Sequence, residues 1–191
     1  MKIFKVTEDS ARVRLVQPTK ERELGFYQFD CESKFHEWKE AEVSVCNPKV
    51  KPKNFYGLTS GFYGPASGIL VFDEKALDIC QTVFEMTGEI IPIQAEQGPT
   101  LYILNVLECM NGLDYKHTVW DYYEDGTKGR ILRYAFHKER IGNESTIFKI
   151  PETSMTDILC YTDERDKEDQ FYHLCRKHKL TGLIFEELVN F

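Results

Sequence analysis

The segment that most constrains the fold is residues 147–191, which alternates between strand-type and helix-type patterns. Apolar runs at residues 147–150 and 158–161 predict two short strands, with Pro151 in the turn that separates them. Gly182 precedes a third apolar run at residues 183–185, which predicts a short buried strand. A charged segment between them predicts a helix. This order is typical of a structural scaffold, and no catalytic pattern occurs in it.

Charge marks both ends of this predicted helix. Its first half is rich in acids, namely Asp163, Glu164, Asp166, Glu168 and Asp169. Its last turn is rich in bases, namely Arg176, Lys177 and Lys179. This arrangement complements the helix dipole, and Thr162 or Asp163 is expected to cap the first turn. The residues expected to form the buried stripe recur at helical spacing, and they are Phe171, Leu174, Cys175 and His178.

Residues 69–93 show the same order of elements. A continuous apolar strand at residues 69–72 is followed by Asp73, a typical capping residue, and then by a helix that ends at Gly88. The apolar positions of that helix are Leu77, Cys80, Val83 and Phe84. A strand at residues 90–93 completes the unit. The agreement indicates either two strand-helix-strand units that share one core or a chance match in a common motif.

Three further patterns complete the predicted fold. Residues 102–109 predict a long apolar strand, and residues 120–123 and 130–136 predict a β-hairpin around Asp125-Gly126. Residues 2–6 and 41–45 predict strands, and prolines at 18, 48 and 52 predict loops. The glycine-rich stretch 54–68 lacks a phosphate-binding pattern and predicts a plain loop. We therefore expect one α+β domain over residues 1–191, with a mixed or antiparallel sheet, and residues 1–60 are its least defined part.

Composition limits the location and the partners of the protein. The chain has 191 residues, and its first residues contain no apolar core of a signal peptide. It has no apolar run near the length that spans a membrane. Six cysteines without a CxxC pair predict reduced, buried thiols, and together these features predict a cytoplasmic protein with no membrane contact. The net charge of −7 opposes nonspecific nucleic-acid binding and favours a basic protein partner.

No residue pattern points to catalysis, a cofactor or a metal. His173 and His178 are separated by five positions, which directs the two rings apart on a helix. Cys175 and His178 could share a face, but no second pair of ligands accompanies them. The chain lacks a GxSxG nucleophile motif and the signature of a cysteine hydrolase. We therefore predict no catalytic, cofactor or metal residues and a protein that is not an enzyme.

One segment does indicate a binding surface. Six consecutive residues at the predicted hairpin combine aromatic and acidic side chains, and they are Trp120, Asp121, Tyr122, Tyr123, Glu124 and Asp125. Tyrosine and tryptophan are frequent in interface hot spots, and the acids suit a basic partner. The alternative is that the aromatic residues belong to the core and the acids only solvate the surface.

Residues 65–189 resemble a family of bacterial immunity proteins of polymorphic toxin systems. The matching patterns include the strands at 69–73 and 90–93, the strand at 101–107, and Leu113-Asp114. The strongest match is the Phe-basic-apolar-Pro-Glu pattern at 148–152 together with the Thr-Gly-Leu-x-Phe-Glu pattern at 181–186. Within this resemblance Asn105, Pro151 and Gly182 are expected to determine the fold.

The resemblance implies a protein that binds and neutralises a toxin encoded beside it, in the cytoplasm of the producing bacterium. It implies no catalytic residues. The acidic charge favours a basic toxin, such as a nuclease. Two other functions fit the sequence. The first is a small cytoplasmic enzyme or nucleotide-binding protein whose site forms only in the fold. The second is an adaptor for a secreted effector.

Overall fold

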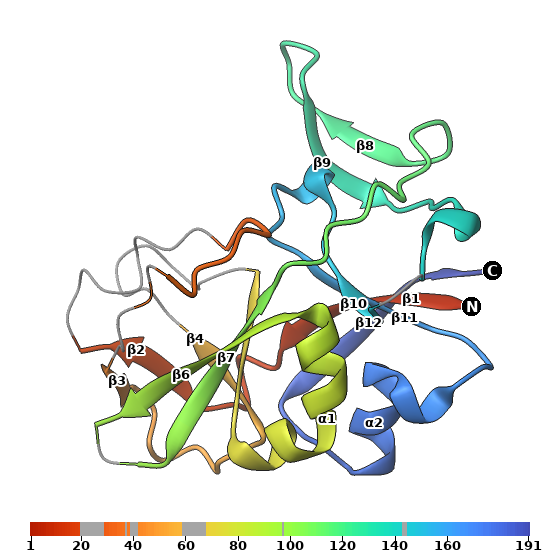
Figure 1. Cartoon of the computed structure of the whole chain (residues 1–191). Coiled ribbons are helices and arrows are strands. Elements are labelled where there is room, and N and C mark those ends of the chain that lie inside the picture. Colours follow the sequence, from red (N-terminus) through yellow and green to blue (C-terminus); the bar gives the residue numbers. More distant parts are fainter. Residues whose placement is uncertain (20–28, 37, 39–41, 59–67, 97, 143–144) are drawn as a thin grey trace.

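The computed structural model confirms the α+β class and divides the strands between a closed barrel, an open sheet and a hairpin (Figure 1). It describes residues 1–19, 29–36, 38, 42–58, 68–96, 98–142 and 145–191. Within these ranges, no helix is both long enough and apolar enough to cross a bilayer. Gly61, Gly64 and Pro65 of the predicted glycine-rich loop lie outside the described residues.

Six strands close into a barrel, which the sequence did not predict. Their order around the barrel is β2, β3, β6, β7, β5, β4. Their bounds are β2 Leu15–Pro18, β3 Glu42–Val45, β4 Phe55–Leu58, β5 Ile69–Phe72, β6 Gly88–Ala95 and β7 Thr100–Val106. Residues from all six strands form one buried cluster. In β5 this cluster contains Ile69 and Val71, whereas the alternate residues, Leu70 and Phe72, belong to a neighbouring buried cluster. This alternation shows that both faces of the barrel wall are buried at β5.

The first predicted strand-helix-strand unit is present as β5, α1 (Glu74–Thr87) and β6. The Asp73 side chain accepts a hydrogen bond of 2.9 Å from the Ala76 backbone amide, as expected for its capping role. Both β5 and β6 pair antiparallel with β7, which therefore lies between them. Gly88 lies so close to β7 that a Cβ there would be 2.0 Å from the Asn105 carbonyl oxygen.

The second unit has the same topology around a different central strand. The four-stranded sheet has the order β10, β11, β1, β12. Its strands are β1 Lys2–Glu8, β10 Ile147–Phe148, β11 Ile158–Thr162 and β12 Leu183–Asn190. Both β11 and β12 pair antiparallel with β1, and α2 (Phe171–Lys177) connects them. The two units therefore share an arrangement in which an antiparallel strand separates the two connected strands.

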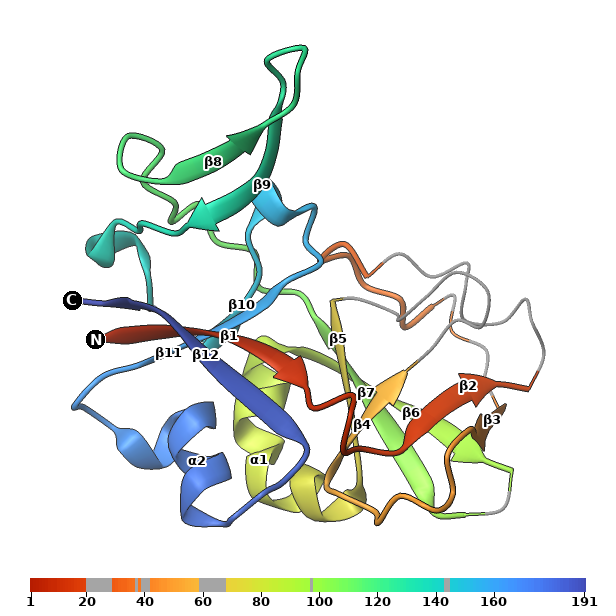
Figure 2. The ribbon, with the colours of Figure 1, turned by 180° about the vertical axis from the view of Figure 1, so that it is seen from behind.

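The two helices pack together over one core, between the barrel and the open sheet (Figures 1 and 2). Phe171 of α2 is fully buried, and its ring centroid lies 5.7 Å from that of Phe84 in α1. Phe84 in turn lies 4.6 Å from Phe72 of β5. This aromatic contact joins the two units into a common hydrophobic core.

The opposite face of the open sheet carries the predicted hairpin, β8 (Val119–Tyr122) and β9 (Lys128–Arg133). A third buried cluster lies between them, with Ile3, Phe148 and Leu159 from the sheet and Phe136 from the chain after β9. Three short 3-10 helices complete the described elements, η2 (Lys138–Arg140), η3 (Pro151–Thr153) and η4 (Lys167–Asp169). The predicted hairpin is present, but its second strand begins at Lys128 and ends at Arg133 instead of spanning residues 130–136.

The predicted start of the last helix was wrong. The acids from Asp163 to Asp169 lie in a loop and in η4, and α2 begins only at Phe171. Asp163 instead organises the loop, because it accepts hydrogen bonds from the Arg165 backbone and guanidinium and from the Gln170 amide. Burial alone would raise the pKa of Asp163, but these hydrogen bonds lower it.

Further predictions for the last unit need correction. His178 is exposed and so lies outside the buried stripe, whereas Phe171 and Cys175 are buried. The strand after Gly182 is longer than predicted and forms an edge of the sheet, with Ile184 47% exposed. The reason is topological, because β12 has a neighbour only on its β1 side among the described residues.

Two other sequence predictions failed in part. β2 ends at Pro18, where the sequence predicts a loop, and β4 lies within the stretch 54–68, which the sequence also predicts to be a loop. Cys80, Cys160 and Cys175 are buried as predicted, but Cys46 and Cys109 are exposed and Cys31 is half-buried. Short strands that pair across the chain carry little local signal, and this explains both missed strands.

Candidate functional site

The hairpin projects from the body of the molecule in both views (Figures 1 and 2). Its base is fixed by an antiparallel bridge between Leu113 and Phe136 and by a 2.8 Å hydrogen bond from the Asp114 amide to the Ala135 carbonyl. Leu113 and Phe136 are both buried. The hairpin is therefore a protrusion on a rigid base.

The structure separates the predicted aromatic residues into two roles. Trp120 packs against the third cluster, and its ring stacks on Tyr115 with centroids 6.3 Å apart. Tyr122 and Tyr123 are 57% and 66% exposed. Trp120 thus anchors the hairpin, as the alternative interpretation expected, while the two tyrosines are available to a partner.

The predicted acids also differ in their surroundings. Asp125 accepts a 2.9 Å hydrogen bond from the Thr127 amide and also bonds the Thr127 hydroxyl, and these bonds lower the pKa of Asp125. They stabilise the turn around Gly126, whose φ of +80° favours glycine. Asp121 bonds the Tyr122 amide at 3.0 Å. Glu124 is exposed near the tip.

The hairpin carries basic residues that the sequence prediction did not include. Lys128, Arg130 and Arg133 lie on β9, which pairs with β8. Lys128 Nζ lies 4.8 Å from the centre of the Trp120 ring, and Arg130 Nε lies 3.8 Å from Asp121 Oδ2. The surface therefore presents both charges, with acids at Asp121 and at the hairpin tip and with bases along β9.

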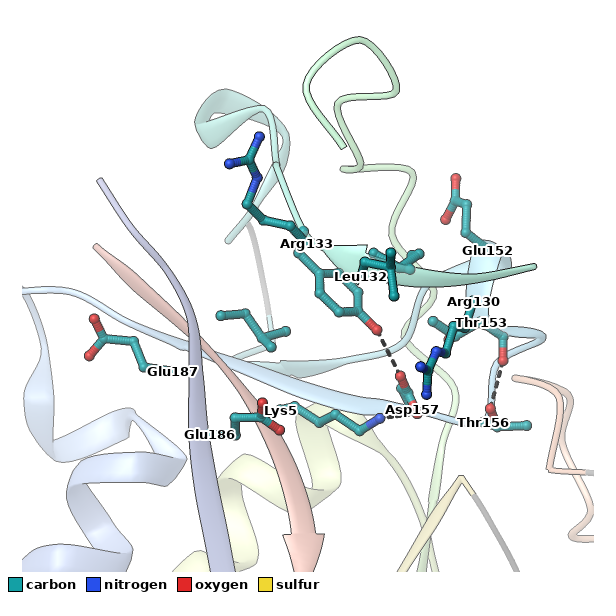
Figure 3. A pocket seen from close by; sticks show the side chains of 13 residues that line it. Lys5, Arg130, Leu132, Arg133, Glu152, Thr153, Thr156, Asp157, Glu186 and Glu187 are labelled. Carbon is teal, nitrogen blue, oxygen red and sulfur yellow. Dashed lines mark hydrogen bonds and ion pairs between the residues drawn. The ribbon is translucent and has the colours of Figure 1, made fainter. Parts of the chain in front are cut away.

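A groove of about 690 Å³ lies between β9 and the open sheet (Figure 3). Arg130, Leu132 and Arg133 line its hairpin side. The sheet and η3 line the rest, with Lys5, Glu152, Thr153, Thr156, Asp157, Glu186 and Glu187 among the lining residues. The positive side faces a predominantly negative one, and no segment of the sequence taken alone signalled this pairing.

The groove has a polar network of half-buried groups. Lys5 Nζ lies 2.8 Å from Asp157 Oδ1, and the Tyr134 hydroxyl donates a 2.9 Å hydrogen bond to Asp157 Oδ2. Burial raises the pKa of Tyr134, and the neighbouring Asp157 charge raises it further. Tyr134 therefore stays neutral and keeps its proton in the hydrogen bond to Asp157. These groups satisfy one another and fix the shape of the groove.

A smaller hollow of about 400 Å³ lies beside α1 and the acidic loop. Thr82 and Met86 line it from α1, and Asp163 and Arg165 line it from the loop. The Asp163 carboxylate is already paired with the Arg165 guanidinium at 2.9 Å. Within the described part of the chain, no group of three or more His, Cys, Asp or Glu residues is placed to hold a metal ion.

The chain was compared with known proteins. A scan against protein-family models matches no family, and a search of curated proteins gives no match. The resemblance to immunity proteins therefore stays a prediction from the sequence.

Proposed function

We propose that this protein binds and neutralises a cognate bacterial toxin in the cytoplasm of the cell that produces it. The hairpin and the groove beneath it would form the contact surface. The observation that supports this proposal is the exposure of Tyr122 and Tyr123, side by side in sequence, on a protrusion fixed at its base. Aromatic anchors of this kind supply most of the binding energy in many protein interfaces.

The charge distribution supports a specific orientation of the partner. Basic residues of the toxin would meet Glu124 near the hairpin tip, and acidic residues would meet Arg130 and Arg133. Charges at the rim of an interface change mainly the association rate and the choice of partner. The net charge of −7 favours a basic toxin overall.

The first experiment is co-expression with the toxin encoded by the neighbouring gene. We expect growth to be rescued and a complex to appear on a sizing column. The double variant Tyr122→Ala/Tyr123→Ala should weaken the complex at least about tenfold. The control is Phe35→Ala, because Phe35 is 74% exposed and its backbone amide bonds Glu89 of the barrel strand β6 instead of the hairpin, and this variant should bind normally. Equal affinity of the double variant and the control would reject the hairpin as the anchor.

A matched pair of charge variants tests the orientation. Both variants should slow association at low salt, because Glu124→Lys repels the basic residues of the toxin and Arg133→Glu repels its acidic residues. Glu124 is preferred to Asp125 for this test because Asp125 stabilises the turn. Faster association of Arg133→Glu would contradict this orientation and would leave only attraction between the net charges.

Stoichiometry separates this proposal from the two alternatives. An inhibitor neutralises the toxin one for one, whereas an enzyme would act at amounts far below that of the toxin. An adaptor would form a complex without rescuing growth. Titration of toxin activity with purified protein therefore distinguishes the three functions.

A further inference from the structure

A buried lysine directly follows β10. Lys149 is fully buried, and its Nζ donates a 2.5 Å hydrogen bond to the Phe29 carbonyl oxygen. Gly68 leaves room for it, since a Cβ there would lie 3.1 Å from Nζ. Burial lowers the Lys149 pKa to about 8, so the ammonium form still predominates at pH 7. A buried charge of this kind is costly unless it interacts with other groups.

Two cysteines flank this lysine. Cys109 forms an isolated parallel bridge with Lys149, and the Lys149 amide donates a 2.9 Å hydrogen bond to the Glu108 carbonyl. Cys31, which is distant from Cys109 in the sequence, has a φ of +66°. The Cys31 and Cys109 side chains are hydrogen-bonded to each other, and the Lys149 charge acts on both. The fold therefore brings together two thiols that are remote in sequence.

Cys31 is held in place by the residues that follow it. The Lys34 amide donates a 2.8 Å hydrogen bond to Glu89 Oε2, and the Asn105 amide donates 2.9 Å bonds to Glu89 Oε2 and to the Glu32 carbonyl. Burial would raise the pKa of Glu89, but these bonds and one from Ser33 lower it. Glu89 thus remains a carboxylate, and its hydrogen bonds attach residues 32–35 to β6 and β7. These bonds fix the chain directly after Cys31.

We propose that Cys31 and Cys109 form a reversible disulfide by exchange with low-molecular-weight disulfides of the glutathione type, beside the Lys149 ammonium. Cys109 reacts first, because it is the more exposed thiol and its thiolate accepts the hydrogen bond from Cys31. Its sulfur attacks glutathione disulfide and releases one reduced glutathione. Cys31 then loses its proton, attacks the Cys109 sulfur and releases the second. Two thiols are oxidised, one external disulfide is reduced, and the protons leave with the two glutathiones.

The same geometry sets the rate of this exchange. Burial raises the pKa of Cys31 to about 12 and also raises that of Cys109, while Lys149 opposes both shifts. Both thiols are thus mainly protonated at pH 7, and a slow exchange is expected. The proximity of the thiols favours ring closure, so the site responds to sustained oxidising conditions. The proposal is independent of toxin binding.

The test uses the purified full chain, reduced and then incubated with excess glutathione disulfide. Mass spectrometry of unreduced peptides should find Cys31 linked to Cys109. In the Cys46→Ser variant, which lacks the other exposed thiol, a thiol assay after denaturation should show the loss of two of five thiols. Dithiothreitol should restore both. Cys31→Ser should leave Cys109 as a mixed disulfide with glutathione, whereas Cys46→Ser should leave the crosslink unchanged. Free thiols at both positions after oxidation, or a crosslink to Cys46 instead, would overturn the proposal.

A lysine variant tests the positioning role of Lys149. At pH 7, Lys149→Met should slow the first exchange at least about threefold, because the thiolate loses its cation. The two rates should converge above about pH 9, where the wild-type amine is neutral. The other charged groups that act on Lys149 are Asp30 and Lys34, and both are unchanged in this variant. A constant rate ratio at all pH values would remove Lys149 from the mechanism. The cysteine variants test the disulfide without Lys149→Met, should that variant not fold.

Discussion

The two strand-helix-strand units share one topology but differ in how their helices are specified. In the first unit, α1 begins at a local cap, Asp73, and ends at Gly88. In the second unit, α2 has no local side-chain cap, and its first amide, that of Phe171, bonds the Thr146 hydroxyl at 3.2 Å. Thr146 is distant in sequence. The comparison shows that local signals suffice for one helix, while tertiary contacts define the start of the other.

The largest effect is expected from the aromatic contact that joins the units. Phe171→Ala and Phe84→Ala each remove a fully buried ring, and each should lower the free energy of unfolding by about 3–5 kcal/mol. Only Phe171→Ala should also lower the hydrogen-exchange protection of α2 selectively, because α2 lacks a local cap. Chemical denaturation and hydrogen exchange measure the two effects. Equal protection of α2 in both variants would show that the helix is specified locally after all.

The glycines at the ends of the two units give the second largest effect. A Cβ at Gly88 would meet the Asn105 carbonyl, and at Gly182, where φ is +112°, it would lie 2.7 Å from the Phe55 carbonyl. Because both obstacles are backbone atoms, alanine at either position should cost about 2–4 kcal/mol in denaturation experiments. Gly126→Ala is the control, since its φ is +80° but no atom lies within 4 Å of its Cβ, so strain alone costs about 1 kcal/mol. A loss in Gly182→Ala no larger than that in Gly126→Ala would mean that backbone strain, and not the close approach to Phe55, determines the cost at Gly182.

The two helix caps sharpen the comparison further. Asp73→Ala and Thr146→Val each remove one hydrogen bond to a first-turn amide, and each should cost about 1 kcal/mol. Hydrogen exchange should locate the first loss in α1 and the second in α2. A loss of protection in α1 on changing Thr146 would refute the assignment of Thr146 as the cap of α2.

The smallest effect on stability is expected in the hairpin, outside both units. Tyr122→Ala with Tyr123→Ala should change the free energy of unfolding by less than about 0.5 kcal/mol, because both rings are exposed. Trp120→Ala is the contrasting variant, since its ring packs on the third cluster, and it should be clearly destabilising. Thermal unfolding of the two variants measures the difference. A large loss in the tyrosine variant would assign these rings to the core.

The sequence predicted the hairpin that carries the candidate surface, but it did not predict which of its aromatic residues are packed and which are exposed. The Asp125-Gly126 pair and the flanking aromatic residues indicated the hairpin because turn chemistry is local. The opposite roles of Trp120 and Tyr123 depend on what lies beneath the hairpin, which only the fold places there. The same holds for the groove, where Arg133 of the hairpin and Glu186 of β12 line one space.

By itself, the sequence determined the α+β class, the first unit from Ile69 to Ile93 and the hairpin, since these depend on periodicity, a cap and a turn within a short stretch. The tertiary structure alone decided the barrel closure, the late start of α2 and the exposed edge at β12. It also placed Cys31 and Cys109 beside Lys149. Each of these features depends on contacts between distant segments, because pairing partners, burial and charge neighbours are properties of the folded chain.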